Sequence, residues 1–204
     1  PRVIHIMPPI ILASGSEIRR HLFENAGVKI DTIPARIDEQ AIKQSLINES
    51  AKPRDIADAL AEYKARKVSS KHPNSTVIGS DQVLDLKGSM LSKPENQPMA
   101  FEQLQMMRGR SHWLYSAAVL YQDGKPIWRF VGKAQMTMRN CSDSYLKDYV
   151  ERNWDEIRHC VGCYQLEAEG SRLFQQVSGD YFTVLGIPLI EVLAFLSSKG
   201  LIDG

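Results

Sequence analysis

The sequence predicts a mixed α/β fold, in which a twisted sheet is flanked by helices and extended by a long antiparallel hairpin. Short apolar runs of strand length alternate with amphipathic segments of helical period. Two long strand-like segments, 111–122 and 126–138, are joined by Asp123-Gly124, a dipeptide typical of tight hairpin turns. The chain has 204 residues, 43% of them hydrophobic, which suffices for one domain and also allows two lobes around a central cleft.

The N-terminal part of the chain predicts a strand, a helix and a second strand-like segment. Residues 10–13 form an apolar run of the length of a short buried strand. A helix is predicted over 17–25, where apolar residues recur at helical spacing, and Gly27 is placed to be its C-cap glycine. Residues 28–34 have strand character.

The middle of the chain predicts a long helix, a strand and a hairpin arm. Pro53 fits the first turn of a helix over 53–70, whose apolar residues line one side. Residues 76–80 are predicted to be a buried strand. The segment 83–86 and the turn at Lys87-Gly88 indicate one arm of a hairpin.

The remaining elements are helices on either side of the long hairpin and at the C-terminus. One helix is predicted over 98–107, and another over 142–153 with Ser142 as its N-cap. After Ile187-Pro188 a last helix is predicted to run to Lys199. Helices between strands, together with the hairpin, are typical of a single mixed α/β domain.

Charge and hydropathy exclude several classes of function. The chain carries 25 basic and 24 acidic residues, a formal net charge of +1, and no long basic run, so its charge directs it to neither nucleic acid nor a membrane surface. It has no secretory signal and no apolar stretch of the roughly 20 residues needed to span a bilayer. We therefore expect a cytoplasmic protein, in which Pro1-Arg2-Val3 is a tail or a processed start.

The three cysteines, Cys141, Cys160 and Cys163, do not form a disulfide framework. Cys160 and Cys163 make a CxxC pair next to His159, but a zinc site needs two more ligands. A redox CxxC normally lies at a helix start after a strand. We interpret all three as partly buried thiols in a reducing compartment, and a zinc- or redox-dependent protein is the less favoured alternative.

The segment Ser14-Gly15-Ser16-x-x-Arg19 follows the first predicted strand and can bind an anion. Gly15 permits a tight turn, and a helix that starts here offers free N–H groups and serine hydroxyls. The guanidinium groups of Arg19 and Arg20 match phosphate oxygens. The GxxxxGK[ST] spacing of a P-loop is absent. The alternative, about equally favoured, is an ordinary helix start capped by Ser16, with solvated arginines.

Carboxylates that follow apolar runs are candidate metal ligands or general bases. Asp81 directly follows a predicted strand end, where it can hold Mg²⁺, take a proton from water, or simply cap a turn. Asp38-Glu39 follows a strand-like run and is either a metal-ligand pair or part of a solvated loop.

Other candidate residues are individually ambiguous. Lys64 lies on an amphipathic helix, where most lysines face solvent, and Lys93 precedes a proline, which favours extended backbone. His112 begins a long strand, where a lone histidine is more often structural than catalytic. Glu167 and Glu169 are weaker candidates still.

The order of these motifs along the chain resembles that of the Maf family of nucleoside triphosphate pyrophosphatases, over residues 10 to about 199. Seven motifs carry the resemblance: Leu12-Ala13-Ser14-Gly15-Ser16-x-x-Arg19, Ile37-Asp38-Glu39, Ala61-x-x-Lys64-Ala65, Ile78-Gly79-Ser80-Asp81-Gln82, Ser92-Lys93-Pro94, Gly109-Arg110-Ser111-His112 and the segment from Gly179 to Leu189.

This resemblance implies a Maf/ITPase-like cleft that converts a nucleoside triphosphate and water to the monophosphate and pyrophosphate. It implies that the triphosphate is held by Ser14, Ser16, Arg19, Lys64 and Lys93. Asp81 is then the general base or a metal ligand, Glu39 helps to hold a divalent cation (Mg²⁺ or Mn²⁺), and Glu167 lies near the reaction centre. The expected catalytic residues are accordingly Asp81, Lys93 and Glu167. Cations and fixed donors suit this chemistry because the leaving pyrophosphate gathers negative charge.

Two departures from the family pattern bear on the choice of base. Glu17-Ile18 stands where many members have Pro-Arg, so Arg19 aligns with the second family arginine and Arg20 has no secure counterpart. Asp81-Gln82 replaces the commoner Asp-Thr, and similar replacements mark a subgroup whose base preference differs from that of the pyrimidine-selective members.

The expected function is a housecleaning enzyme that removes modified or unwanted nucleotides. The alternative is a non-catalytic nucleotide-binding regulator of cell division, since the family is linked by name to septum formation. Asp81 discriminates between them, because a pure binder gains nothing from a carboxylate beside a triphosphate without a metal. The expected partner is the nucleoside triphosphate, with no nucleic acid and no membrane, and the sequence leaves the oligomeric state, including a homodimer, open.

Overall fold

The computed structural model describes residues 7–204, so Pro1-Arg2-Val3 lies outside the described residues. Its centre is a sheet in the order β2-β1-β3-β5-β6-β7, with β4 paired to β3 beside this path. The strands are β1 (Ile10–Leu12), β2 (Asp31–Thr32), β3 (Thr76–Leu86), β4 (Ser89–Leu91), β5 (Ser111–Gln122), β6 (Lys125–Met138) and β7 (Phe174–Ser178). The helices are α1 (Glu17–Asn25), α2 (Glu39–Asn48), α3 (Pro53–Ser69), α4 (Gln97–Met107), α5 (Asp143–Ile157), α6 (Tyr181–Leu185) and α7 (Leu189–Ser198), with a 3₁₀ turn at Glu169–Leu173.

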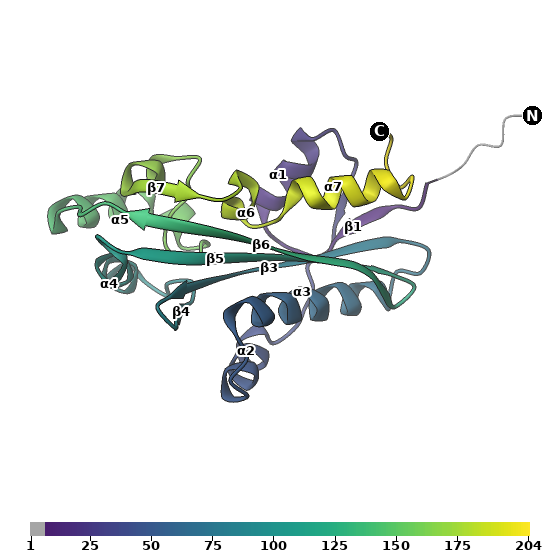
Figure 1. Cartoon of the computed structure of the whole chain (residues 1–204), viewed down its shortest axis with the longest axis horizontal. Coiled ribbons are helices and arrows are strands. Elements are labelled where there is room, and N and C mark those ends of the chain that lie inside the picture. Colours follow the sequence, from purple (N-terminus) through teal and green to yellow (C-terminus); the bar gives the residue numbers. More distant parts are fainter. Residues whose placement is uncertain (1–6) are drawn as a thin grey trace, which may run out of the picture.

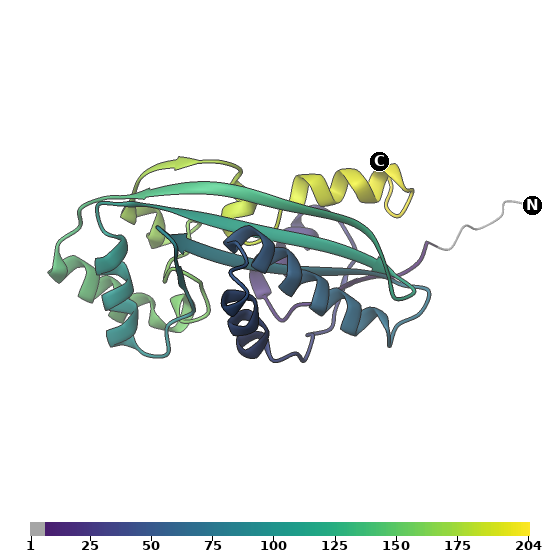
Figure 2. The ribbon, with the colours of Figure 1, turned by 60° about the horizontal axis from the view of Figure 1, so that its bottom comes forward.

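The sheet mixes parallel and antiparallel pairs and is covered by helices on both faces. β1 runs parallel to β2 and β3, whereas β3–β5, β5–β6 and β6–β7 are antiparallel pairs. α1, α6 and α7 cover one face of the sheet, and α2 and α3 lie on the other (Figure 1). α4 and α5 pack together at the end of the sheet away from β1 (Figure 2). The predicted mixed α/β fold is thus confirmed.

The long antiparallel hairpin is confirmed, with β5 at its predicted bounds and β6 beginning one residue early. Asp123 and Gly124 join the strands with φ angles of 47° and 73°. Positive φ at both central positions is the geometry of a type I′ turn, whose twist matches that of the flanking strands.

The helices predicted over 17–25, 53–70 and 98–107 and at the C-terminus are confirmed to within one residue at each predicted end. The helix predicted over 142–153 is also present, with Ser142 as its N-cap, but it continues to Ile157, because that side chain is buried in the core. Within residues 7–204 no helix is both long and apolar enough to cross a membrane.

β3 corrects the predicted strand end at Ser80. The strand is continuous from Thr76 to Leu86 and pairs with β5 throughout its centre, with Asp81 opposite Ala117. The prediction was wrong because the polar residues of this stretch resemble a loop, although most of them are buried. Asp81 therefore lies within a strand, on the face of the sheet, rather than after its end.

The strand predicted over 28–34 is wrong for most of its length. Only Asp31–Thr32 forms a strand, which pairs with β1 at the outer edge of the sheet. The chain then leaves the sheet near Pro34, which cannot donate a ladder hydrogen bond.

The helix α2 was not predicted, and it changes the interpretation of Asp38-Glu39. Asp38 is the N-cap of α2, and its side chain accepts a hydrogen bond from the Ala41 backbone N–H at 3.0 Å. The idea that these two acids form a metal-ligand pair is therefore wrong for Asp38, because its carboxylate is committed to the cap. Glu39 is the first residue of the helix, and its side chain is available to the cleft described below.

α3 packs directly on the backbone of β3 because residue 79 is glycine. A Cβ atom on Gly79 would lie 2.0 Å from the Ala61 carbonyl oxygen and 2.7 Å from the Ala65 backbone nitrogen. Both neighbours are backbone atoms of α3, so no side chain can occupy this position without moving the helix. This close approach brings Lys64 of α3 over Asp81 of β3.

Candidate active site

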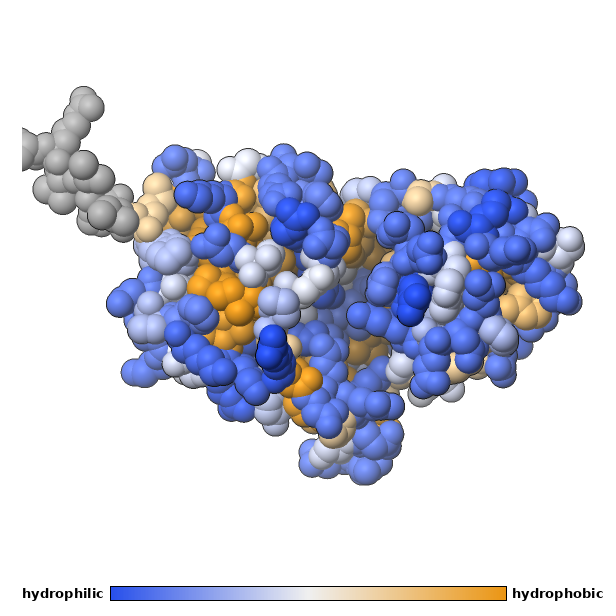
Figure 3. Space-filling model, turned by 180° about the vertical axis from the view of Figure 1, so that it is seen from behind, coloured by the Kyte–Doolittle hydropathy of each residue, from blue (hydrophilic) through white to orange (hydrophobic). Residues whose placement is uncertain are grey.

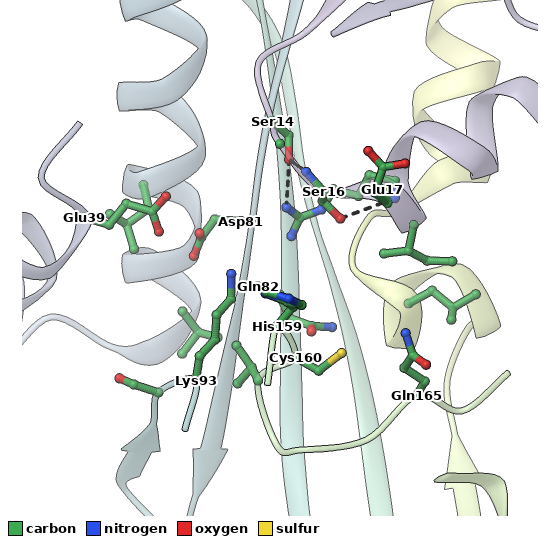
Figure 4. Close-up of a pocket in the computed structure, with 18 of the residues that line it drawn as sticks. Ser14, Ser16, Glu17, Glu39, Asp81, Gln82, Lys93, His159, Cys160 and Gln165 are labelled. Carbon is green, nitrogen blue, oxygen red and sulfur yellow. Dashed lines mark hydrogen bonds between the residues drawn. The ribbon is translucent and has the colours of Figure 1, made fainter. Parts of the chain in front are cut away.

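A cleft of about 880 Å³ gathers the candidate residues of the sequence analysis. One face of the molecule is visibly hollowed between its two halves (Figure 3). The cleft is lined by all the residues to which the resemblance assigns a role: Ser14, Ser16, Arg19, Glu39, Lys64, Asp81, Lys93 and Glu167. Figure 4 shows Ser14, Glu39, Asp81 and Lys93 around one space, although they come from separate segments of the chain.

The turn between β1 and α1 forms one side of the cleft. Ser16 is the N-cap of α1, and its hydroxyl accepts from the Arg19 backbone N–H at 3.4 Å. The Ser14 hydroxyl oxygen accepts from the Ser16 backbone N–H at 3.1 Å and from Arg19 Nη1 at 3.3 Å. Both sequence interpretations therefore apply, because the capped helix start also presents hydroxyls and a guanidinium to the cleft.

The two neighbouring arginines have different surroundings. Arg19 Nε donates to the Gly186 carbonyl oxygen at 2.9 Å, which fixes its guanidinium inside the cleft. Burial lowers the pKa of Arg19, and the carboxylates of Asp81 and Glu39 oppose that shift. Arg20 instead forms ion pairs on the surface of α1 with the acids one turn before and after it, and it does not line the cleft.

An ion triad made of a buried Lys64–Asp81 pair and the exposed Glu39 lies in the cleft. Lys64 Nζ is 2.8 Å from Asp81 Oδ1 and 3.0 Å from Glu39 Oε1, and it also donates to the Ser80 carbonyl oxygen at 3.4 Å. Lys64 and Asp81 are each only 7% exposed. The amphipathic helix therefore buries this lysine, rather than leaving it in solvent.

The carboxylates of the triad fit a hard divalent cation. Glu39 and Asp81 approach one point from α2 and β3, and both offer oxygen atoms. Within residues 7–204 no group of three or more histidine, cysteine or acidic side chains could hold a metal by itself. A pair of carboxylates completed by phosphate oxygens and water is the way in which Mg²⁺ is commonly bound, so the residues present suit a metal that arrives with a phosphate ligand.

Two further lysines, Lys43 and Lys93, line the cleft, and only Lys93 was predicted to do so. Figure 4 shows Lys93 reaching toward Asp81. Lys43 of α2 also lines the cleft, and its Nζ donates to the Ser92 hydroxyl at 3.1 Å. Burial lowers the pKa of Lys43, and Asp81 and Glu39 oppose this shift. The sequence analysis missed Lys43 because its position depends on α2, which was not predicted.

The opposite wall is formed by the segment that follows α5, and it carries Glu167. This side chain is exposed toward the cleft, and partial burial of its carboxyl raises its pKa. Glu169 lies outside the cleft. Hydrogen bonds from Arg152 and Asn153 lower the pKa of Glu169 to about 2. Of these two acids, only Glu167 remains a candidate site residue.

Gln82 links the floor of the cleft to α6. Its Nε2 donates toward the carbonyl oxygens of Thr183 and Val184 at 3.1 and 3.0 Å, and lies 3.1 Å from the Ser116 hydroxyl. Because two carbonyl acceptors require the NH₂ group on that side, the Oε1 atom is left as an acceptor.

The cysteines do not have the surroundings of reactive thiolates. Cys160 lines the cleft, and burial raises the pKa of its thiol to about 11. Burial raises the pKa of Cys163 to about 12, and its Sγ lies 3.2 Å from Gln103 Oε1. Cys141 is buried. Thiols with raised pKa values remain protonated and make poor metal ligands and nucleophiles.

His112 lies in the core behind the second wall, as the structural interpretation of this residue predicts. It is 1% exposed, and its Nε2 is 2.8 Å from the hydroxyl of Tyr164, whose ring lines the cleft. Burial lowers the pKa of His112 to about 4, so the ring is neutral near pH 7.

The cleft between these elements is lined by cationic side chains and a carboxylate pair, and comparison with known proteins places the chain in a family. The family model described as Maf-like protein matches residues 9–199. The chain belongs to this family, as its motifs predict.

Similar proteins cover almost the whole chain. A protein of Ruegeria pomeroyi named nucleoside triphosphate pyrophosphatase is 56% identical, over 96% of this chain and 98% of its own length. One of the same name from Roseobacter denitrificans is 57% identical, over 94% and 96%. A protein of Brucella abortus named 7-methyl-GTP pyrophosphatase is 44% identical, over 96% and 98%. A solved dITP/XTP pyrophosphatase of Mycobacterium abscessus is 16% identical with a TM-score of 0.35, over 65% of this chain and 73% of that one, a likeness too weak to carry an argument.

Proposed function

We propose that this member of the Maf-like family hydrolyses nucleoside triphosphates to the nucleoside monophosphate and pyrophosphate, in a housecleaning role. The observation that carries the proposal is the ion triad beside the N-terminus of α1, in which the buried Lys64 and Asp81 form an ion pair and the exposed Glu39 joins it from α2. This arrangement combines donors for a phosphate chain with carboxylates that can bind a cation and take a proton. The names of relatives at 56% and 57% identity support the same reaction class.

The triphosphate is held on the first wall of the cleft. The N-terminus of α1 offers backbone N–H groups and a positive end of the helix dipole, and Ser14 and Ser16 add hydroxyls. Arg19, Lys64 and Lys93 supply positive charge where the leaving pyrophosphate gathers negative charge. These residues therefore stabilise the transition state more than the ground state.

Asp81 is placed to act as the general base. Its Oδ1 contacts Lys64 Nζ at 2.8 Å, whereas no described residue forms a hydrogen bond with its Oδ2. The free oxygen can accept a proton from the attacking water. Lys93 and Glu167 complete the proposed catalytic set, Lys93 beside Asp81 and Glu167 from the opposite wall.

Glu39 and Asp81 are the proposed ligands of Mg²⁺ or Mn²⁺. When bound, such a cation neutralises phosphate charge and lowers the pKa of coordinated water. Lys64 is then the residue that holds both carboxylates in place before the nucleotide arrives.

Product analysis tests the proposal. Purified protein with Mg²⁺ or Mn²⁺ is expected to release the monophosphate and pyrophosphate from a nucleoside triphosphate, and to lose this activity when the metal is chelated. A nucleoside diphosphate with orthophosphate would overturn the assignment. Tight nucleotide binding without turnover of any normal or modified nucleotide would instead support the non-catalytic regulator.

The choice of base follows from Gln82 and from the relatives. The fixed Gln82 amide leaves an acceptor oxygen, and a buried acceptor rejects a base that leaves it unpaired. A relative at 44% identity is named 7-methyl-GTP pyrophosphatase. We expect that dTTP is not the best substrate and that a methylated guanine nucleotide is a better one. Values of kcat/KM for dTTP, UTP, GTP and 7-methyl-GTP measured side by side decide this, and a clear preference for dTTP or UTP contradicts it.

A further inference from the structure

α2 carries a second cleft residue one helical turn after Glu39. Residues four apart on a helix share one face, so Glu39 and Lys43 both project toward the cleft, and both line it. Glu39 forms an ion pair with Lys64 in the triad, whereas Lys43 extends toward the loop that carries Ser92. α2 thus presents a carboxylate and an ammonium to different parts of one ligand.

Lys43 is a half-buried cation without an anionic partner. Its one hydrogen bond among residues 7–204 goes to the neutral Ser92 hydroxyl, and no carboxylate of this part of the chain lies within 4.0 Å of it. An ammonium group has three N–H donors, so two remain for a ligand in the cleft. Charged groups that lose solvent without gaining a partner are costly, which favours an anion at this position.

The other cations of the cleft differ from Lys43 in their partners. Lys64 is neutralised by two carboxylates, and Arg19 is fixed by a carbonyl and a hydroxyl. Lys93 has no ion pair within residues 7–204, and it follows Ser92 directly in the chain. Lys43 and Lys93 are therefore two cleft lysines that form no ion pair with a described carboxylate, although the charges of Asp81 and Glu39 reach Lys43 from a longer distance.

We infer that Lys43 binds the pyrophosphate part of the triphosphate, the part that leaves. This inference rests on the proposed function, in which Asp81 marks the α-phosphate where water attacks. Lys43 lies beyond ion-pair distance of Asp81 and bonds Ser92, and we place the phosphates beyond the breaking bond on this side of Asp81. Positive charge there stabilises the leaving group.

Binding of inorganic pyrophosphate tests the inference without requiring turnover. Calorimetric titrations with Mg²⁺ compare pyrophosphate with a nucleoside monophosphate for the wild type and for Lys43→Gln. One charge-assisted hydrogen bond corresponds to a loss of roughly tenfold or more in affinity. Pyrophosphate binding is expected to weaken by that factor in Lys43→Gln, with the monophosphate affected less than about twofold.

Two further variants separate phosphate binding from a merely structural contact. Ser92→Ala removes the link between α2 and the loop but keeps the ammonium, so it is expected to retain most of the pyrophosphate affinity. Lys67→Gln removes an exposed lysine of α3 that does not line the cleft, and it serves as the control. The inference would be overturned if Lys43→Gln bound pyrophosphate as tightly as the wild type does. It would also be overturned if Lys43→Gln weakened the binding of pyrophosphate and of the monophosphate equally, or if Ser92→Ala weakened pyrophosphate binding as much as Lys43→Gln does. Failure of the wild type to release pyrophosphate from any nucleotide would instead sink the proposed function, independently of this result.

Discussion

The two walls of the cleft are built on different principles. The first wall, made by the β1–α1 turn, α2, α3 and β3, contains Arg19, Lys43 and Lys64, and regular elements hold its charged groups. The second wall, made by the segment after α5 and by α6, contributes acidic and neutral groups such as Glu167 and Gln165. This difference in charge supports the proposal that the first wall binds the phosphates and the second wall the rest of the nucleotide.

The walls also differ in how their side chains are fixed. On the first wall the central contacts are ion pairs between side chains of separate elements. On the second wall they are hydrogen bonds that involve backbone carbonyls or buried neutral groups: two carbonyls of α6 accept from the Gln82 amide of β3, and Tyr164 forms a hydrogen bond with His112. We therefore expect substitutions of Arg19 and Asp81 on the first wall to change catalysis, whereas substitutions of His112 and the cysteines at the second wall should change stability more than catalysis.

The sharpest test of the first wall is Asp81→Asn. Loss of a general base typically lowers the rate by about 10²–10⁴-fold. Lys64 keeps Glu39 as a partner and Asn is similar in size, so the fold is expected to persist. Measurements of kcat and thermal unfolding check both points, with Asp85→Asn on the same strand, outside the cleft, as the control. Near wild-type turnover in a folded Asp81→Asn variant would remove Asp81 from the mechanism.

Arg19 and Arg20 form a matched pair within one helix. Arg19→Ala is expected to lower kcat/KM by roughly 10- to 100-fold, because a charge-assisted bond contributes about 1.5–3 kcal/mol. Arg20→Ala should change it by less than about threefold, since its ion pairs are on the surface. Steady-state kinetics of the two variants check that Arg19, and not Arg20, is the family arginine of the cleft. Equal losses of kcat/KM, or a larger loss for Arg20→Ala, would show that this alignment is wrong.

His112 behind the second wall predicts a pH dependence of stability rather than of catalysis. Its pKa in the folded protein, about 4, is below the ordinary 6.5, so the unfolded chain takes up the proton first as the pH falls. The stabilisation is therefore complete above pH 6.5 and is lost as the pH falls toward 4, by about 3 kcal/mol in total. Urea unfolding between pH 7.5 and 4.5 should show a smaller loss in His112→Gln. Parallel curves for wild type and variant would rule out this contribution.

The smallest effect is expected from the cysteines of the second wall. Cys160 and Cys163 have raised thiol pKa values, so neither is needed as a thiolate. Replacement of both by Ser should leave kcat/KM within about twofold of the wild type, with some loss of stability because Cys163 is buried. Activity assays and metal analysis of both proteins check this. Stoichiometric zinc that disappears from the double variant together with activity would support a zinc-dependent protein instead.

Elements with a regular apolar period were predicted from the sequence, whereas elements without one were missed or given the wrong end. α1 and the β5–β6 hairpin have regular apolar periods and clear end signals, and their predicted bounds agree with the structure. α2 has no fully buried residue, and its apolar side is short: Ile42 and Leu46, four positions apart, pack only partly buried against the core. This weak period and the cap at Asp38 were its sequence signals, and the helix was not predicted from them. β3 was divided at Ser80 because its buried polar residues look like a loop.

The candidate site was predicted from the order of its motifs, not from geometry. Asp81 and Lys64 are 17 positions apart in the chain, and only the packing of α3 on β3 shows that they form an ion pair. Lys43 could not be predicted, because its place in the cleft depends on the unpredicted helix α2. Contacts between side chains of different helices and strands cannot be predicted from the pattern of a single sequence.

The glycine at position 79 has a consequence for the thermodynamics of ligand binding. Because α3 and β3 touch through backbone atoms there, Lys64 and Asp81 are ordered before any nucleotide arrives. A ligand that engages them loses little conformational entropy at this point, since the protein has already been ordered by folding. The Lys43 ammonium, by contrast, is held among the described residues by a single hydrogen bond to the exposed Ser92, so more of its ordering falls to the binding step. Calorimetry should therefore assign a larger entropic loss to the contact with Lys43 than to the contact with Lys64.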